Sequence, residues 1–459
     1  MTDQAMTGAP SEAASNQFAL FKSRRFWPLF TVQFLGVFND QTFKNAFVAL
    51  LTFRLADSLA MTEGDVDQFI QMSAALYILP FALCAATAGK ISDAVDKAVM
   101  MRWVKFAEIV LMCIAAYSYL TQNLTVLMIL MFLMGAQSAF FAPIKYGVLP
   151  QYMNRDEMPP ANGLIQGATF LAILLGQIFG AKLVLTGSGV LLVSVAVIVI
   201  AIIGWIASFA APSAPAIAPE TRVKVTPAVF IMGIVRMPWD MIKIIIDCAP
   251  AKPAMFAMLG LGWFWFAGAT FMSLIFPLAR YSLSASEDAA LIMLTAFSIG
   301  VALGAVLYAQ IVKGEVTLRT APIGAIGMGV GAILFWLAVG AYGGDLPADG
   351  ALLTAGEFLA RPDAWIVLAT LVMIAMFAGL YVTPFNVEYQ VKAPEGEKGR
   401  FVACSNVIDA LCMVFSAIVV LILVGTLGVP REMMFALVGV TGFISAFIVW
   451  RKVKAYEAA

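Results

Sequence analysis

The sequence predicts an all-α integral membrane protein whose twelve transmembrane helices form two six-helix bundles. Hydrophobic residues make up 62% of the chain and charged residues only 12%, and the mean hydropathy is +0.91. Soluble domains carry about 25% charged residues, so this chain has too few polar groups to cover its apolar ones in water. A transmembrane β-barrel is not expected, because barrel strands show short alternating patterns and the apolar residues here form long continuous runs.

Twelve apolar blocks are each long enough to cross a hydrocarbon core, which takes about 20 helical residues. They are expected at residues 26–54, 68–90, 98–120, 124–146, 161–184, 188–210, 254–280, 288–312, 319–342, 364–389, 401–427 and 431–451. The longest polar connection separates the first six blocks from the last six. The predicted division is a tail at 1–25, a bundle at 26–210, a linker at 211–253, a second bundle at 254–451 and a tail at 452–459.

The first tail is polar and rich in Ala and Ser, which is typical of disorder. It is not a cleavable signal, because the apolar run that follows exceeds the roughly 7 to 15 residues of a signal core. The linker opens with the Pro/Ala tether APSAPAIAPETRVKVTP and continues with VFIMGIVRMPWDMIKIIID. Two interpretations of this second stretch are open: an amphipathic helix on the inner leaflet, or a tether with surface charges.

Lysine and arginine are concentrated on one side of the predicted topology. Of the 28 cations, 22 fall on the two tails and the even-numbered connections, whereas the other side carries acids such as Asp57, Glu63 and Asp67. Cytoplasmic loops are enriched in Lys and Arg, so both termini are expected in the cytoplasm. The five cysteines lie in predicted helices or on that side, where disulfides are not expected. The formal net charge of zero indicates no nucleic-acid partner.

The two halves of the chain share sequence features. A stretch with Pro143 and Asn162 can be laid over a second stretch with Pro384 and Asn406. GKISDAVDKAVMMR after the second block is echoed by AQIVKGEVTLRTAP after the eighth. Parallel repeats related by an axis along the membrane normal build the halves of several transporters, so these echoes indicate two related bundles.

Several motifs resemble one family of transporters. GKISDAVDK resembles the signature G-x-L-[SA]-D-x-x-G-[RK] of the major facilitator superfamily, but Asp96 stands at the second glycine position. FLGVFNDQTFKNA, FFAPIKYGVLP with ANGLIQGATFLAILLG, and FAGAT at residues 266–270 are similar to its lysophospholipid transporter branch. They resemble in particular the membrane portion of bacterial transporter–acyltransferase fusions. Relatives carry an arginine where Met272 stands, so the resemblance does not extend to phosphate recognition from that helix.

The resemblance implies the major facilitator fold and a transporter rather than an enzyme. Its implied substrates are lysophosphatidylethanolamine and related single-chain lipids, which would move inward across a bacterial inner membrane by alternating access. The implied partners are membrane lipids and an acyltransferase that acts on the product, and a monomer is expected. Gating is expected at Gly89, Asp93, Lys97 and Arg102. With the inner gate shut, Asp93 would pair with a cation such as Arg102 or cap the helix that begins near Phe401.

Asp40 and Lys44 lie in the middle of the first apolar block, where an isolated charge costs about 2.5 to 3.5 kcal/mol. They are four residues apart, so they share a helix face and can pair. One interpretation is a structural pair. The other is a headgroup site in which Asp40 binds an ammonium and Lys44 a phosphate, with Asn39 as a neutral hydrogen-bonding neighbour. The second is favoured, because ions inside a membrane usually mark a transport pathway.

Other polar residues on predicted helices are further candidates for substrate binding. Lys145 ends the fourth block, either as an ordinary cytoplasmic cation or as a phosphate contact. Asp409 lies about 13 Å into the eleventh block at 1.5 Å per residue, and needs a partner or a proton. Glu108 is similarly deep in the third block, where a structural pair is expected. The neutral candidates, which interhelical hydrogen bonding would also explain, are Gln166, Asn386 and Asn406.

The chain contains no histidine. This excludes histidine proton relays, zinc sites with histidine ligands and the His-x4-Asp chemistry of acyltransferases. No P-loop motif is present to indicate the use of ATP. No catalytic residue, metal or cofactor is therefore expected. Two rival functions stay open: a proton-coupled exporter of amphiphilic drugs that uses Asp40 or Asp409, and a non-transporting scaffold for an acyltransferase.

Overall fold

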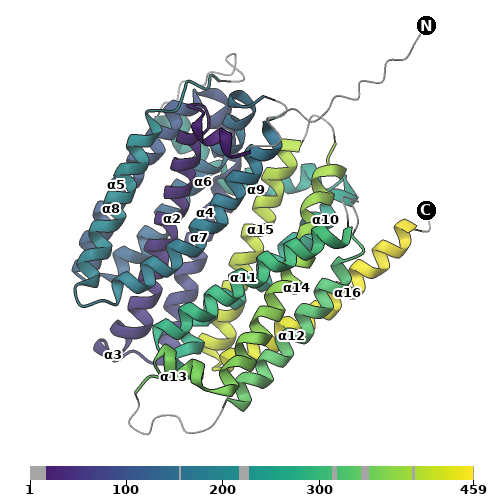
Figure 1. The fold of residues 1–459 in the computed structure, drawn as a ribbon. Helices are drawn as coiled ribbons and strands as arrows, with labels where there is room; N and C mark the ends of the chain where they lie inside the picture. The colour runs from purple at the N-terminus through teal and green to yellow at the C-terminus, as the bar shows by residue number, and fades with distance from the viewer. Residues whose placement is uncertain are drawn as a thin grey trace. The chain divides into compact units, whose positions relative to one another are not determined.

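The computed structural model describes residues 17–154, 157–216, 227–312, 318–342, 351–394 and 398–457. Within them, twelve helices of 20 to 32 residues coincide with the twelve apolar blocks (Figure 1), which confirms the predicted fold class. These are α2 (Trp27–Leu50), α4 (Glu63–Ala94), α5 (Lys97–Leu120), α6 (Leu124–Tyr152), α7 (Met158–Val184), α8 (Gly189–Ser208), α10 (Lys252–Pro277), α11 (Glu287–Val312), α12 (Ala321–Ala341), α14 (Pro362–Lys392), α15 (Lys398–Val420) and α16 (Arg431–Glu457).

Short elements extend or join these helices. A 3-10 turn, η1 (Gln17–Lys22), precedes α2, and π-helical turns η2 (Leu51–Leu55), η4 (Leu278–Ser282) and η5 (Leu421–Thr426) continue α2, α10 and α15. The remaining elements are α3 (Ala56–Ser58), α13 (Ala355–Ala360) and α9 (Pro227–Cys248), which belongs to the linker. Trp239 and Ile246 of α9 are 65% and 60% exposed, and its position on the inner leaflet stays a prediction. Residues 1–16 of the expected tail and 217–226 of the linker lie outside the described residues.

Ten of the described helices are long and apolar enough to cross a membrane by length and composition alone. Of the twelve helices that coincide with the apolar blocks, the two missing from this set are α2 and α5. Both carry charged residues within the apolar stretch, namely Asp40 and Lys44 in α2 and Lys105 and Glu108 in α5. A helix with such residues needs polar partners inside the protein to remain in a bilayer.

Contacts between residues divide the chain into two compact units. Unit 1 comprises residues 1–45, 84–183 and 188–236, and unit 2 comprises residues 46–83, 184–187 and 237–459. The end of the first long helix and most of the second therefore belong by contact to unit 2. Each unit is described below by itself.

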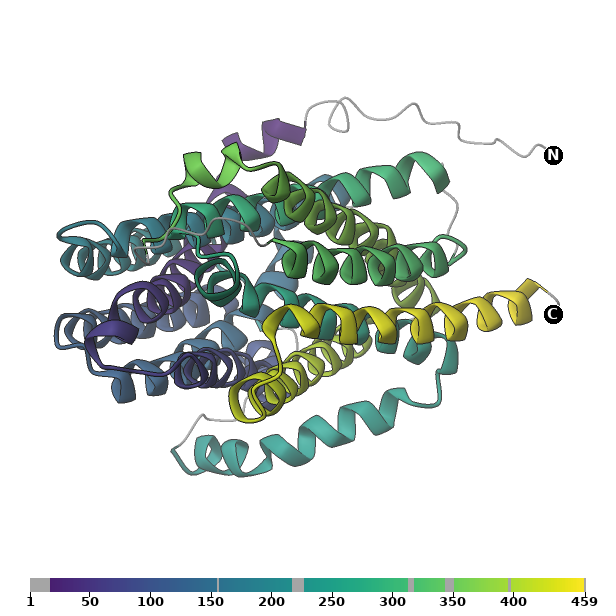
Figure 2. The same cartoon turned by 90° about the horizontal axis from the view of Figure 1, so that it is seen from below.

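In unit 2, α12 packs against α14 and α16, and α10 packs against α14 and α15. Figure 2 shows α12 and α16 side by side, as does Figure 1. Thr270 of the FAGAT motif joins α10 to α15, because its hydroxyl lies 2.7 Å from that of Ser416. Trp263 on α10 donates to Thr441 on α16 at 3.0 Å. Lipid tails are as apolar as the helices, so there is little hydrophobic driving force for the helices to associate. Hydrogen bonds such as these therefore help to hold neighbouring helices together.

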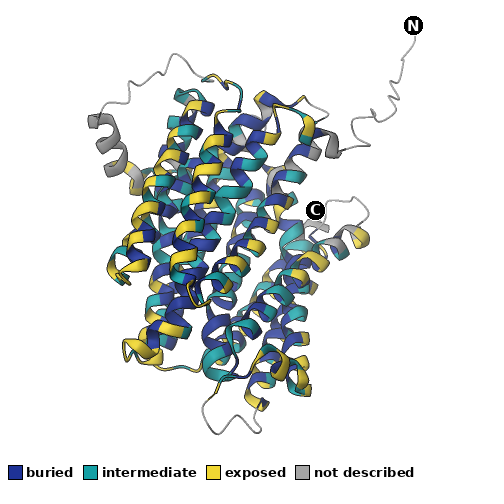
Figure 3. Cartoon of the chain, turned by 60° about the vertical axis from the view of Figure 1, so that its left-hand side comes forward, coloured by how far each residue is buried: buried dark blue, intermediate teal, exposed yellow. Residues whose placement is uncertain are grey.

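In unit 1, α5 and α8 pack along each other. Both helices carry exposed residues (Figure 3), and many of these residues are large and apolar. Tyr117 on α5 is 67% exposed and Ile206 on α8 is 60% exposed. Exposed apolar surface costs about 25 cal/mol per Å² in water, so a continuous apolar face is stable only when something apolar covers it. Such faces are expected on a multi-pass membrane protein, where lipid covers them.

The motif that contains Asp40 is positioned by two glycines of α7. A Cβ atom at Gly176 would lie 2.6 Å from the carbonyl oxygen of Phe38, and one at Gly180 would lie 2.3 Å from that of Thr42. Real Cβ atoms do not approach so closely, so only glycine allows α7 to touch the backbone of α2 here. This small-xxx-small spacing is a common interface between membrane helices, and it fixes the middle of α2 within unit 1.

Candidate functional site

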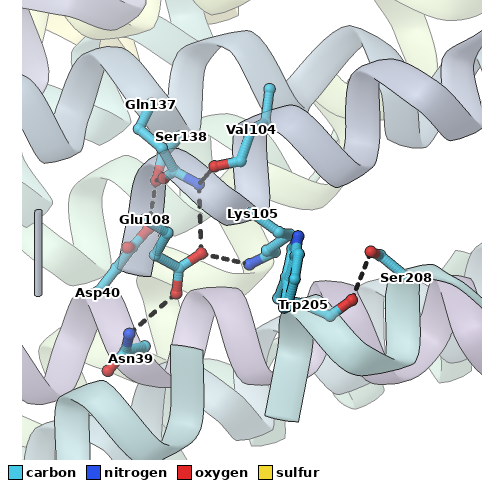
Figure 4. A network of polar contacts seen from close by, with 9 residues as sticks. All are labelled: Asn39, Asp40, Val104, Lys105, Glu108, Gln137, Ser138, Trp205 and Ser208. Atoms are coloured by element: carbon cyan, nitrogen blue, oxygen red, sulfur yellow. Dashed lines mark hydrogen bonds and ion pairs between the residues drawn. The ribbon is translucent and has the colours of Figure 1, made fainter. Parts of the chain in front are cut away.

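Glu108 lies at the centre of a buried polar network in unit 1 (Figure 4). Its carboxylate accepts hydrogen bonds from Lys105 Nζ at 2.6 Å, Asn39 Nδ2 at 2.9 Å and Gln137 Nε2 at 3.2 Å. The side chains of Lys105 and Glu108 are only 2% and 1% exposed. The network therefore joins α2, α5 and α6 through one carboxylate that is balanced by one ammonium.

A glycine makes room for that ammonium. A Cβ atom at Gly36 on α2 would lie 2.4 Å from Nζ of Lys105, so a larger residue there would displace the lysine. The ring of Phe141 lies on another side, with its centroid 5.3 Å from Nζ, which is within the range of a cation–π interaction. Gly36 thus keeps Lys105 within reach of Glu108.

Asp40 lies beside this network and has partners on two helices. Its carboxylate accepts a hydrogen bond from the hydroxyl of Ser138 on α6 (Figure 4), and it attracts Lys44 one turn further along α2. Gln137 and Ser138 are adjacent on α6 and donate to Glu108 and Asp40 respectively, so they connect the two carboxylates. Asp40 is 6% exposed, whereas Lys44 is only partly buried.

Three members of this network were missed from the sequence. Lys105 is one of the 22 cations that the sequence places on the tails and even-numbered connections, but its side chain is only 2% exposed and lies in the buried network. Gln137 and Ser138 were not singled out. The expected structural pair of Glu108 is present, with Lys105 three residues earlier as its partner. Opposite charges at that spacing inside an apolar block are the signal that could have found the pair.

The other residues expected to contact the substrate differ in how exposed they are. Lys145 on α6 is 8% exposed, and the side chain of Gln166 lies outside the described residues. In unit 2, Asn386 and Asn406 are exposed, and Asn386 donates to the carbonyl of Val382 at 3.3 Å. Their roles in binding stay predictions.

Asp409 on α15 is a partly buried acid whose carboxylate makes few hydrogen bonds. Its Oδ2 accepts a weak hydrogen bond from Ser405 at 3.5 Å, and its Oδ1 has no hydrogen-bond partner among the described residues. A carboxylate away from water without a cation is unfavourable, so Asp409 suits either a proton or a cationic ligand.

The expected gating residues occupy the start of α5 and its surroundings. Lys97 is completely buried and packs over Gly147 of the KYG motif, where a Cβ atom would lie 2.7 Å from Cε of the lysine. Arg102 donates to the carbonyl of Ala211 at 3.5 Å. A Cβ atom at Gly89 would meet nothing within 4 Å. The side chain of Asp93 lies outside the described residues, and so does its expected pairing.

Asp96, which stands at the signature's second glycine position, is the N-cap of α5. Its Oδ1 accepts from the backbone N–H of Ala98 at 2.8 Å and of Val99 at 3.3 Å. The carboxylate also accepts from the hydroxyl of Ser213 and from the N–H of Ala214, at the start of the linker. Partial burial by itself would raise the pKa of Asp96, but these hydrogen bonds outweigh it and hold the pKa below its usual value.

We expect Asp96→Ala to destabilise the protein by about 1 kcal/mol, the typical cost of losing an N-cap. The stabilisation is present above the ordinary pKa of about 3.9 and is lost as the pH falls through the lowered folded-state value. Thermal unfolding in detergent at pH 7 would measure the loss. Ser213→Ala, which keeps the cap, is the control and should cost less. Equal melting temperatures for Asp96→Ala and the wild type would contradict the capping role.

A second cluster of charges lies in unit 2, at the ends of helices on the acid-rich side. Arg431 at the start of α16 contacts Glu63 Oε2 at 2.8 Å and Asp67 Oδ2 at 2.7 Å, both on α4. Asp67 is 1% exposed. Arg280 on η4 holds Asp57 of α3 through two bonds of 2.6 and 2.7 Å, although Asp57 is 71% exposed. The ring of Tyr281 lies against both guanidinium groups, 4.6 Å from that of Arg431 and 5.4 Å from that of Arg280.

A multi-pass bundle of apolar helices with charged groups buried inside it is the architecture of a membrane transporter. The sequence model of the Major Facilitator Superfamily matches residues 29–417, and the chain belongs to that family. This confirms the predicted family and fold.

Several relatives carry the name Lysophospholipid transporter LplT. The chain is 26% identical over 354 residues to the Lysophospholipid transporter LplT of Enterobacter sp. (strain 638), covering 75% of this chain and 79% of that one. It is 24% identical over 461 residues to LplT of Escherichia fergusonii, covering 96% and 99%.

Solved structures show the same fold. The D-xylose–proton symporter superposes with a TM-score of 0.67 at 14% identity, covering 92% of this chain and 96% of that one. A POT family transporter in complex with 5-aminolevulinic acid also gives 0.67, at 13% identity, covering 94% and 96%. These relatives and neighbours are transporters, and the protein is a transporter rather than an enzyme.

Proposed function

We propose that the protein transports lysophosphatidylethanolamine and related single-chain lipids inward across the bacterial inner membrane by alternating access. The observation that carries the proposal is the Asp40–Lys44 pair in the middle of α2. The headgroup of lysophosphatidylethanolamine has an ammonium and a phosphate, and this pair offers a carboxylate for one and an ammonium for the other. The names of the relatives support a lysophospholipid as the substrate.

The two sets of opposite charges in unit 1, Lys105 with Glu108 and Lys44 with Asp40, differ in a way that separates their roles. Lys105 and Glu108 are both almost completely buried and balance each other, as expected of a structural pair. Lys44 is only partly buried, so its ammonium is the more accessible to a ligand. We therefore assign a structural role to Lys105 and Glu108, which hold α2, α5 and α6 together. Asp40 and Lys44 are assigned to binding the substrate headgroup.

The acyl chain stays in or near lipid throughout the transport cycle. Moving it into water would cost about 0.8 kcal/mol for each CH₂ group, which a headgroup site does not compensate. A lateral opening between helices is therefore part of the proposed mechanism.

Uptake of labelled lysophosphatidylethanolamine by proteoliposomes, with and without a proton gradient, tests the proposal. We expect uptake above that of protein-free vesicles. No uptake by a folded preparation would favour drug export or a scaffold role.

One observation favours a proton-coupled exporter of amphiphilic drugs as the second candidate. Asp409 has a carboxylate oxygen without a hydrogen-bond partner among the described residues, as suits a proton site. Asp409→Asn should abolish gradient-driven drug export if this alternative holds. The same variant should retain lysolipid uptake along a concentration gradient if it does not.

The charge cluster of unit 2 is the proposed outer gate of the cycle. Its contacts join α3 and the start of α4 to η4 and the start of α16. In the linear sequence the three acids lie between the first two apolar blocks, whereas Arg280 ends the seventh block and Arg431 begins the twelfth. Separating these helix ends therefore requires breaking the ion pairs. The pairs made by Asp57 and Glu63 can reopen easily, because these side chains are 71% and 58% exposed and an exposed pair contributes only about 0.2 to 1 kcal/mol. The pair between Arg431 and Asp67 is the buried one.

We expect Arg431→Gln to weaken this gate more than Asp57→Asn. Loss of Arg431 strands the buried carboxylate of Asp67, which costs several kcal/mol in the closed state. Labelling by a membrane-impermeant maleimide at Thr52→Cys, in a chain without its native cysteines, should rise about tenfold or more, since tenfold corresponds to about 1.4 kcal/mol. Asp57→Asn removes a partner that is 71% exposed and should change labelling less than about fivefold. Equal labelling rates in the wild type and both variants would rule out the gate.

A further inference from the structure

The helices α12 and α16 touch backbone to backbone at one point of their contact. A Cβ atom at Gly439 would lie 2.9 Å from the carbonyl oxygen of Gly329, and one at Gly442 would lie 3.0 Å from that of Ala325. Pro322 and Ile326 near the start of α12, and Phe443, Phe447 and Trp450 towards the end of α16, are larger residues that line the space between the helices. The helices thus meet at the glycines and leave a wedge between them further along.

The wedge is a cavity of about 340 Å³ that is open on one side. Its lining is formed by Pro322, Ile326, Phe443, Ala446, Phe447 and Trp450. Phe447 is 57% exposed and Trp450 is 45% exposed, whereas Ala446 is 4% exposed and forms the floor. A cavity of this size and lining is within the range of small-molecule sites, and it suits a hydrocarbon chain.

Two cations rest on the aromatic walls of the wedge. Lys454 Nζ lies 4.2 Å from the ring centroid of Trp450, and the guanidinium of Arg451 lies 5.9 Å from that of Phe447. Both side chains are exposed. The cation-rich end of α16 is the end expected in the cytoplasm, where the leaflet carries anionic lipids.

We propose that α12 and α16 bind one diacyl phospholipid with an anionic headgroup. An acyl chain fills the apolar wedge, and the headgroup phosphate is bound by Arg451 and Lys454. Charge decides the headgroup, because Arg451 and Lys454 contact the aromatic rings of a wedge whose lining residues are all uncharged, and two cations favour a net negative lipid. All of these residues belong to unit 2, whereas Asp40 and Lys44 belong to unit 1, so the proposal does not depend on the proposed substrate.

Native mass spectrometry of the detergent-purified protein, given equal amounts of phosphatidylglycerol and phosphatidylcholine with the same acyl chains, tests the site. We expect one phosphatidylglycerol to bind to the wild type with at least fivefold preference. Arg451→Gln with Lys454→Gln should bring the preference below twofold. The control, Lys182→Gln with Arg361→Gln, removes two cations elsewhere and should keep it. Equal binding of both lipids to the wild type, or the same loss of preference in both double variants, would overturn the proposal.

A second pair of variants tests the wedge itself. Ala446→Phe and, independently, Ile326→Phe place a ring in the cavity and should lower binding of both lipids at least fivefold. Thermal unfolding in lipid-free detergent identifies the variants that fold. Undiminished lipid binding by a folded variant of either kind would show that no acyl chain occupies the wedge.

Discussion

Lys105→Met should destabilise the protein by about 3 to 5 kcal/mol, the cost of breaking a buried ion pair from one side. The substitution strands the carboxylate of Glu108, which is 1% exposed and keeps only the amide donors of Asn39 and Gln137. Thermal unfolding and size-exclusion chromatography in detergent would measure the loss. Because this network joins three helices, we expect much of the variant to aggregate during purification.

The double variant Lys105→Met with Glu108→Gln should recover most of that stability. It leaves no buried charge, and the amide oxygen of the new glutamine can accept from Asn39 and Gln137. Lys44→Met is the matched control, since it also removes a lysine from a membrane helix but one that is only partly buried. It should cost clearly less than Lys105→Met. If Lys105→Met melts with the wild type, Glu108 does not need its ammonium and the assigned structural role is wrong.

The double variant Asp40→Asn with Lys44→Met should fold well and lose transport. It removes both charged partners of a zwitterionic headgroup, and a hydrogen bond to a charged group contributes about 1.5 to 3 kcal/mol. We therefore expect uptake of lysophosphatidylethanolamine by proteoliposomes to fall about 100-fold or more. No buried charge is stranded, so the melting temperature should stay close to that of the wild type.

The single variants separate the two ends of the headgroup. Lys44→Met should weaken uptake of all phosphate-bearing lysolipids, whereas Asp40→Asn should discriminate against ethanolamine more than against glycerol headgroups. Lysophosphatidylglycerol, which lacks the ammonium, is the control substrate. Near-normal uptake of lysophosphatidylethanolamine by the double variant would show that the pair is structural. The headgroup would then be recognised elsewhere, with Lys145 and Asp409 as the next candidates.

Local patterns of residues were enough to predict the helices and the position of Asp40 and Lys44 inside the first of them. Each helix depends on about 20 consecutive residues that must satisfy their own backbone hydrogen bonds in lipid, so a local pattern of hydropathy is enough to find it. A charge in the middle of such a stretch is equally visible, because its cost depends on depth and not on distant residues. The same local rule applied to Lys105 and Glu108 would have revealed the second pair.

Which polar groups meet depends on how the helices pack against one another. Asn39, Glu108 and Gln137 lie on three helices, and their hydrogen bonds depend on how those helices pack. Arg431 and Asp67 are 364 residues apart in the chain and still form an ion pair. Partners of this kind are set by side-chain packing between helices, which residue spacing along one helix does not encode. For that reason the sequence predicted the charges inside the membrane, and the structure was needed to show which of them hold the helices together.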